Sequence, residues 1–171
     1  ISDTHNKIAK VYDYLFDKEI DIIVHLGDVC DDAILLEDLL KGEVIYVKGN
    51  NDFYVAGGEY DKVVRISDKN IFITHGHKYN VYSGVTRLVE KSKSLNCKMC
   101  LYGHTHRYFN ETIDGVWVIN PGSVTYPRDG QAGFVIYDTN NEQITFQYKY
   151  VPCTNWDILI LKKSYCRLSE I

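Results

Sequence analysis

The sequence predicts an α/β fold in which two stacked mixed β-sheets are flanked by helices. The N-terminal half alternates segments of helical spacing with short β-branched runs, whereas the C-terminal half consists mostly of strand-like runs separated by turn residues. The chain has 171 residues, of which 45% are hydrophobic, and this length and composition suit one sizeable core. We therefore expect residues 1–171 to form a single domain, in which segment 155–171 is a short helix or a strand of unknown role.

The first segments predict a strand, a helix and a second strand. Polar residues 3–5 have the place of a loop that follows a strand, and because the chain opens at Ile1 without a methionine, we expect that strand to lack its first residues. Apolar residues then recur at helical spacing over 8–16. The next run, 22–26, is β-branched and short, as in a buried strand.

The same pattern occurs once more, so the N-terminal half is predicted to be a βαβαβ unit. A helix is predicted over 32–40, with Asp31 or Asp32 as the cap of its first turn, and a strand is predicted over 44–47. In sheets of this kind, ligands bind beyond the carboxyl ends of the strands.

The remaining chain predicts a hairpin, a helix and further strands. Runs 63–66 and 71–74 are separated by a polar stretch that suits a hairpin turn, and a helix is predicted over 85–95. The rest consists mostly of strand-like runs, with turn signals at 114–115 and 140–141.

Composition and charge exclude several classes of function. The net charge is −4 and charged residues make up 25% of the chain, so the sequence lacks the broad basic character that extended nucleic acid requires. No apolar run approaches the length of a membrane span and no secretory signal is present, which predicts a cytoplasmic protein without a membrane partner. Five cysteines, an odd number, argue against a disulfide framework and predict free thiols.

Polar side chains that commonly bind metal ions directly follow five of the predicted strands. We expect these segments to converge at one edge of the sheets. They are Asp3-Thr4-His5, Gly27-Asp28, Gly49-Asn50-Asn51-Asp52, His75-Gly76-His77 and Gly103-His104-Thr105-His106. Five of the six histidines lie in them, whereas His25 lies inside an apolar strand and is assigned to the core.

The ligand types indicate which metals such a site would bind. Imidazole nitrogen combined with carboxylate or amide oxygen suits manganese, iron, nickel or zinc rather than calcium. No cysteine lies in these segments, which disfavours a structural zinc site and favours an open catalytic one. Seven candidate ligands exceed what one ion needs and suit two ions, about 3.5–4 Å apart, that share a carboxylate. The seven are Asp3, His5, Asp28, Asn50, His75, His104 and His106.

Taken in order, the five motifs resemble those of the calcineurin-like metallophosphoesterase superfamily. The pattern D-x-H, G-D, G-N-x-[DE], H and G-H-x-H extends from residue 1 to about residue 138, and its specificity comes from the whole set, since each motif alone is weak. The short chain and segments 74–77 and 120–124 are similar to the small bacterial and archaeal phosphodiesterases of that superfamily. The resemblance implies a four-layer sandwich and a hydrolase that acts on a small phosphate ester.

The resemblance also implies a role for each candidate ligand. A metal-bridging hydroxide would attack phosphorus in line, without a covalent intermediate on the enzyme. Manganese is the metal that the resemblance favours, with nickel, iron and zinc as alternatives, and a homodimer is compatible with it. The ligands of the first metal would be Asp3, His5, Asp28 and His106, and those of the second would be Asp28, Asn50, His75 and His104, with Asp28 as the bridge.

The sequence departs from the superfamily at Asn51. Many phosphomonoesterases of the group have a histidine there, thought to protonate the leaving alkoxide, and asparagine cannot supply that proton. General acid catalysis contributes about 10²- to 10⁴-fold, so its absence favours substrates with a good leaving group, and we expect a phosphodiesterase rather than a phosphomonoesterase. His77 could be a substitute acid or a donor to a metal ligand, and Arg128 could bind a phosphate oxygen.

A protein-binding scaffold is the runner-up function. The same fold with similar motifs serves as a retromer subunit that contacts partner proteins. A scaffold is free to lose metal ligands, whereas all seven ligand positions are filled here, and this completeness favours the enzyme.

Three other features allow two interpretations each. Cys97 and Cys100 form a C-x-x-C pair but lead into a strand rather than a helix, so they are interpreted as structural rather than redox-active. Segment 120–123 is either a turn or a substrate contact. Tyrosines near the motifs either pack or stack on a substrate base, and packing is favoured. These tyrosines are Tyr79, Tyr82, Tyr102, Tyr108 and Tyr126.

Overall fold

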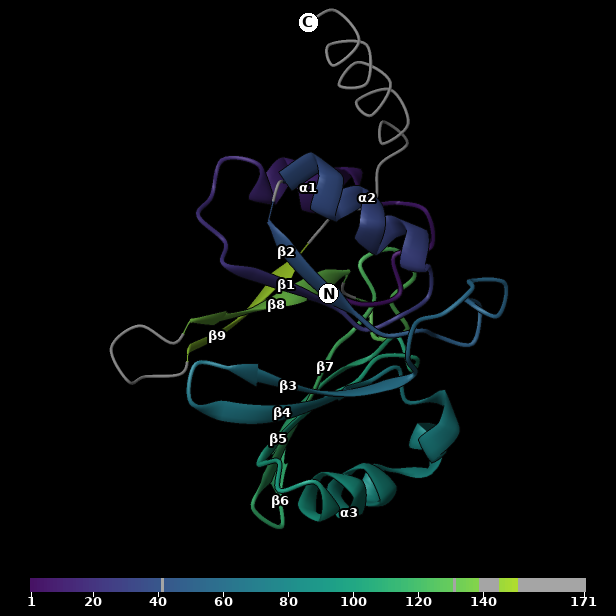
Figure 1. Cartoon of the computed structure of the whole chain (residues 1–171), viewed down its shortest axis with the longest axis vertical. Coiled ribbons are helices and arrows are strands. Elements are labelled where there is room, and N and C mark those ends of the chain that lie inside the picture. Colours follow the sequence, from purple (N-terminus) through teal and green to yellow (C-terminus); the bar gives the residue numbers. More distant parts are fainter. Residues whose placement is uncertain (41, 131, 139–144, 151–171) are drawn as a thin grey trace, which may run out of the picture.

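The computed structural model describes residues 1–40, 42–130, 132–138 and 145–150. Figure 1 shows two layers of strands between helices α1 (Ala9–Leu15) and α2 (Cys30–Leu40) on one side and α3 (Thr86–Ser94) on the other. The predicted α/β fold class is confirmed. Among the described residues, no helix combines the length and apolarity needed to cross a membrane.

From α1 onward, helices and strands alternate as the sequence predicts, whereas residues 1–2, predicted to end a first strand, belong to no strand. Strand β1 (Ile22–His25) follows α1, and strand β2 (Glu43–Tyr46) follows α2 and pairs with β1 in parallel. Two backbone hydrogen bonds, one from the N–H of Leu26 and one from the N–H of Asp3, join residues 1–3 to the end of β1. The N-terminal segment is therefore held at the same sheet edge as the loops after β1 and β2.

The predicted cap of α2 is wrong. The helix begins at Cys30, so Asp31 and Asp32 lie inside its first turn. The carboxylate of Asp52, in the loop after β2, instead accepts a hydrogen bond from the N–H of Cys30 at 2.7 Å. Because this partner lies far along the chain, the residues around the helix start could not indicate it.

The larger sheet contains the predicted hairpin. Strands β3 (Asp61–Ile66) and β4 (Lys69–Thr74) form it, and the 3₁₀ turns η1 (His77–Tyr79) and η2 (Val81–Ser83) lead on to α3. Three more strands complete the sheet, β5 (Met99–Leu101), β6 (Tyr108–Ile113) and β7 (Val116–Pro121). The order is β3-β4-β5-β7-β6, with β4, β5 and β7 parallel to one another.

The last described strands form a second hairpin. Strand β8 (Gly133–Asp138) pairs antiparallel with β9 (Thr145–Tyr150). The predicted turn at 114–115 joins β6 to β7 and is confirmed. The predicted turn at 140–141 and segment 155–171 lie outside the described residues.

Three hydrophobic clusters fill the spaces between the four layers, and strand alternation decides which cluster each side chain joins. Ile23 of β1 and Phe134 of β8 pack with α1 and α2, whereas their neighbours Val24 and Val135 pack with the five-stranded sheet. Phe72 of β4 packs with α3 on the opposite side of that sheet. Strands covered on both faces have near-continuous apolar runs, which explains the β-branched segments of the sequence.

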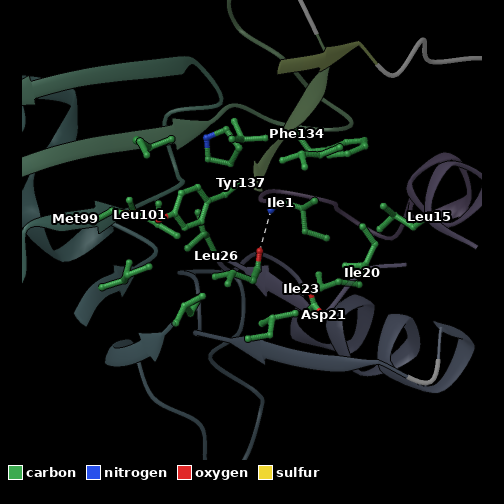
Figure 2. A pocket seen from close by; sticks show the side chains of 18 of the residues that line it. Ile1, Leu15, Ile20, Asp21, Ile23, Leu26, Met99, Leu101, Phe134 and Tyr137 are labelled. Atoms are coloured by element: carbon green, nitrogen blue, oxygen red, sulfur yellow. Dashed lines mark hydrogen bonds between the residues drawn. The ribbon is translucent and has the colours of Figure 1, made fainter. Parts of the chain in front are cut away.

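A cavity of about 430 Å³ lies between the sheet layers beside the first residue (Figure 2). Its lining is mostly apolar and comes from β1, β8 and the five-stranded sheet. The backbone nitrogen of Ile1 donates to the carbonyl oxygen of Val24 at 2.8 Å. None of the seven candidate metal ligands lines the cavity, so it is separate from the polar site.

Candidate metal centre

The segments that carry the seven candidate ligands meet at one edge of the two sheet layers. Asp28 and Asn50 follow the carboxyl ends of β1 and β2, and His75 and His104 follow those of β4 and β5. Asp3 reaches the same edge because its backbone is bonded to the end of β1. Parallel strands place their carboxyl ends together, which is why segments far apart in the sequence converge here.

A first group of ligand-type side chains consists of Asp3, His5 and His106. Nε2 of His106 lies 3.2 Å from Oδ1 of Asp3 and 3.4 Å from Nε2 of His5. Nδ1 of His106 donates to the carbonyl oxygen of Tyr126 at 2.7 Å, which orients the ring and leaves Nε2 facing Asp3. The ligand atoms of the three side chains lie within 4.8 Å of one another, close enough to hold one ion.

A second group consists of Asp28, Asn50, His75 and His104. Nε2 of His75 lies 3.1 Å from Oδ1 of Asn50, 3.2 Å from Nδ1 of His104 and 3.5 Å from Oδ2 of Asp28. Nδ1 of this buried ring donates to the carbonyl oxygen of Leu26 at 2.7 Å. Nε2 of His75 is therefore the nitrogen that faces the other ligands.

The two groups adjoin, and their polar atoms fit metal ions. Ligand atoms of Asp3, Asp28 and His75 lie within 4.8 Å of one another. Oδ1 of Asp3 is buried and has no hydrogen-bond partner. In each of two histidine pairs, ring nitrogens face each other at 3.2 or 3.4 Å. Imidazole nitrogens and carboxylate oxygens are metal ligands, and divalent cations at this place would satisfy both the nitrogens and the carboxylate oxygen.

The two carboxylates of the centre are ionised at neutral pH. Burial opposes the ionisation of Asp28, but the hydrogen bond and charge of His75, together with the N–H of Asn51, lower its pKa to about 2. Burial also opposes the ionisation of Asp3, and the contacts with His106 and His75 outweigh it and lower the pKa. In return, the contact with the carboxylate of Asp3, whose Oδ1 lies 3.2 Å from Nε2, raises the pKa of His106. The same negative charge would attract divalent cations.

The loops hold their ligands in rare backbone conformations. Five candidate ligands have φ angles between 47° and 70°, a left-handed region that such residues seldom occupy. They are Asp3, His5, Asp28, His104 and His106. A Cβ on Gly49 would collide with the carboxylate of Asp28, and a Cβ on Gly103 would collide with the hydroxyl of Ser2. Space therefore requires glycine before Asn50 and before His104.

Asp52 holds two of the ligand loops together, a role that sequence reasoning missed. Its buried carboxylate accepts hydrogen bonds from the N–H groups of Asp28 at 3.0 Å, Gly49 at 2.7 Å and Cys30 at 2.7 Å. Such charge-assisted hydrogen bonds are stronger than neutral ones. The signal that could have identified Asp52 is the acidic residue that ends the G-N-x-[DE] motif.

His25 supports the centre without being one of its ligands. The ring is fully buried, so the prediction that it lies in the core is confirmed. The N–H of Gly27 donates to Nδ1 at 3.2 Å, which places the proton of the neutral ring on Nε2, from where it is donated to Oγ1 of Thr4 at 3.0 Å. Burial lowers the pKa of His25 to about 3 and keeps the ring neutral. The ring thus joins loop 3–5 to the loop after β1.

Segment 120–123 braces two other ligand loops. Nδ2 of Asn120 donates to the carbonyl oxygen of Gly103 at 2.8 Å, and Oγ of Ser123 donates to the carbonyl oxygen of Asp3 at 2.8 Å. Both side chains are fully buried. The structural interpretation of this segment is therefore favoured over a substrate contact.

Two of the remaining site candidates lie against the second group. Nδ2 of Asn51 donates to Oδ2 of Asp28 at 2.7 Å and its N–H donates to Oδ1 at 3.0 Å, so Asn51 orients this carboxylate. The ring of His77 lies 5.4 Å from the ring of His75, and Nδ1 of His77 is buried without a hydrogen-bond partner. Burial, together with the neighbouring histidines, lowers the pKa of His77 to about 4.

Arg128 and two exposed tyrosines lie at the rim of the centre. The ring of Tyr82 lies 5.1 Å from that of His104, and the ring of Tyr126 lies 5.5 Å from that of His5. Nη1 of Arg128 donates to the hydroxyl of Tyr82 at 2.8 Å. The two tyrosines are 55% and 51% exposed, so their contacts at the rim leave about half of each side chain open to solvent.

The described cysteines are structural. Cys30, Cys97 and Cys100 are buried free thiols. Burial raises the pKa of Cys30 and of Cys100 to about 12, so neither is a reactive thiolate at neutral pH. The structural interpretation of the C-x-x-C pair is confirmed.

The chain is similar to known proteins in sequence and in structure. A family model described as calcineurin-like phosphoesterase superfamily domain matches residues 1–142. Phosphodiesterase MJ0936 of Methanocaldococcus jannaschii is 30% identical over 165 residues, which cover 84% of this chain and 93% of that protein. A conserved Streptococcus pneumoniae protein, described as a predicted phosphoesterase, has a crystal structure that matches with a TM-score of 0.73 at 25% identity and covers 88% of this chain and 86% of that one. Vps29 of Entamoeba histolytica shares the fold, with a TM-score of 0.71 at 22% identity over 89% of this chain and 97% of that one.

Proposed function

Because the chain belongs to the calcineurin-like phosphoesterase superfamily, we propose that it is a two-metal enzyme that hydrolyses small phosphodiesters. The observation that carries this proposal is the meeting of seven metal-ligating side chains, from five segments, at one sheet edge. The two ligand groups adjoin through Asp3 and Asp28, which suits two ions that share a carboxylate. Mixed nitrogen and oxygen ligands favour a divalent transition metal, and we propose manganese.

The chain's own residues would hold the ions and the loops around them. Two divalent ions at such a site supply an acidified water and a counter-charge for the phosphoryl oxygens. Asn51 keeps the carboxylate of Asp28 in place through its two hydrogen bonds, and Asp52 fixes the backbone of the same loop. Arg128 would bind a phosphoryl oxygen from the rim. We assign Asp3, His5, Asp28 and His106 to one ion and Asp28, Asn50, His75 and His104 to the other.

Neither candidate acid is suited to protonate a leaving group. Asn51 has no titratable proton, and His77 is neutral at physiological pH because burial lowers its pKa to about 4. Loss of general acid catalysis costs about 10²- to 10⁴-fold for poor leaving groups and much less for good ones. We therefore propose that diesters with a good leaving group are better substrates than alkyl phosphomonoesters.

Hydrolysis of bis-p-nitrophenyl phosphate by metal-stripped protein with Mn²⁺ restored tests this proposal. We expect activity that Asp28→Ala abolishes, because this variant lacks the carboxylate shared by both ions. Asp17→Ala removes an exposed carboxylate at the end of α1 and is expected to leave the activity unchanged. Failure of protein that binds two ions to hydrolyse any phosphate ester would overturn the proposal and favour a protein-binding scaffold instead.

A further inference from the structure

Tyr82 presents an exposed ring beside the second ligand group. The ring lies 5.1 Å from that of His104 at an interplanar angle of 61°. The hydroxyl donates to the carbonyl oxygen of His104 at 3.0 Å and accepts from Nη1 of Arg128 at 2.8 Å. These bonds fix the hydroxyl end of the ring, while 55% of the side chain remains exposed.

Tyr126 presents a second exposed ring beside the first ligand group. The ring lies 5.5 Å from that of His5, and the residue's carbonyl oxygen accepts from Nδ1 of His106 at 2.7 Å. Nζ of Lys7 lies 4.9 Å from the ring centroid. The side chain is 51% exposed. Each ligand group therefore has one tyrosine ring, anchored next to a ligand and open to solvent.

Rings held in this way suit stacking against a flat group of the substrate. Covering an exposed aromatic ring with another planar ring removes apolar surface from water and adds ring–ring attraction. Stacking accepts any planar ring, including a nucleobase, and offers much less to a methyl group. The cationic groups of Lys7 and Arg128 beside the two rings suit an anionic diester.

From this arrangement we infer that the preferred substrates are phosphodiesters in which the ester group that stays on phosphorus carries an aromatic ring, whatever the leaving group, and that Tyr82 or Tyr126 binds that ring. This inference rests on the proposed function, since it names the substrate class of the same centre. A phosphodiester has two organic groups, and each of the two ligand groups has one tyrosine beside it to receive one of them. Aryl and nucleobase rings share this chemistry.

Three diesters with the same leaving group test the inference. Each releases p-nitrophenolate, and the second ester group is methyl, p-nitrophenyl or thymidine. Because the bond that breaks is the same, differences in KM report on the second group. We expect KM for the methyl diester to be about tenfold or more above that of the better of the two diesters whose second group carries a ring, in line with the effect of one stacked base. A lower KM for the thymidine diester indicates a nucleobase, and a lower KM for the nitrophenyl diester indicates an aryl group.

Variants of the two tyrosines decide whether these rings cause the preference. We expect Tyr82→Leu, Tyr126→Leu or the double variant to bring the KM ratio to within about twofold, while Tyr82→Phe and Tyr126→Phe retain the ratio because the ring remains. Phe16→Leu removes an exposed ring at the end of α1 that is not one of the candidate site residues, and should not change the ratio. Equal KM values for the methyl diester and for the two diesters whose second group carries a ring, or a preference that survives the double leucine variant, would overturn the inference while leaving phosphodiesterase activity in place. If no diester is hydrolysed, the proposed function itself fails.

Discussion

Asn51 contacts the carboxylate of Asp28 and cannot act as a general acid for the leaving group. Its side-chain amide donates to Oδ2 of Asp28 at 2.7 Å and has no proton to give to an alkoxide. We predict that Asn51→His raises kcat/KM for phosphomonoesters about tenfold or more, because a general acid contributes about 10²- to 10⁴-fold. Release of inorganic phosphate from an alkyl phosphomonoester, assayed in parallel with hydrolysis of bis-p-nitrophenyl phosphate, measures this. A change of equal size and sign on both substrates would show that the histidine acts on metal binding rather than on the leaving group.

His25 makes stability depend on pH in a predictable direction. Burial lowers its pKa from 6.5 to about 3, so between these values the unfolded chain binds a proton that the folded chain does not. Stability therefore falls as pH decreases below about 6.5, by up to about 1.4 kcal/mol per pH unit from this group. His25→Gln retains a donor for Thr4 and does not titrate. Urea unfolding at several pH values between 7.5 and 5 gives the free energy of unfolding at each pH. This free energy should decrease less with falling pH in the variant than in the parent protein, and equal decreases would contradict the prediction.

At the scale of whole elements, Asp52 connects the loops after β1 and β2 with the start of α2. Its carboxylate accepts three backbone hydrogen bonds, and an amide in its place would present N–H to N–H. We predict that Asp52→Asn lowers the free energy of unfolding by about 2–3 kcal/mol and weakens metal binding. Asp38→Asn, which changes an exposed carboxylate on α2, is the matched control for urea denaturation. Equal losses in both variants would show that Asp52 has no special role.

The elements themselves were largely predictable, whereas the connections between them were not. Helix α3 and the β3–β4 hairpin follow from local periodicity and a polar turn, which depend only on neighbouring residues. The cap of α2 was missed because its partner is 22 residues away. The meeting of the candidate ligands could be predicted because parallel strands bring their ends together, so order along the chain was enough. The exposure of Tyr82 and Tyr126 could not be predicted, because the local sequence does not show which other segments cover a ring.

Across the whole molecule, the candidate metal centre joins the two sheet layers. Asp28 and Asn50 come from one layer, and His75 and His104 come from the other. A ligand that binds only the folded state stabilises it by about 2.7 kcal/mol at 100 times its Kd, and in a chain of this size about 1 kcal/mol shifts Tm by about 2–4 °C. Because the proposed centre holds two ions, which together contribute about twice this free energy, we predict that Mn²⁺ at about 100 times its Kd raises Tm by about 10 °C or more relative to EDTA-treated protein. Asp28→Ala should lose most of this shift, and an undiminished shift in that variant would contradict the assignment.

The buried thiols offer a way to time local opening of the molecule. Cys30 lies at the start of α2 beside the ligand loops, whereas Cys97 and Cys100 lie in the cluster that packs against α3. A maleimide can alkylate each thiol only after its surroundings have separated, so the labelling rate counts openings. With Cys153 and Cys166 replaced by serine, peptide mass spectrometry would measure the labelling rates of the two regions separately. If the ions hold the ligand loops together, adding Mn²⁺ should lower the labelling rate of Cys30 more than the labelling rates of Cys97 and Cys100.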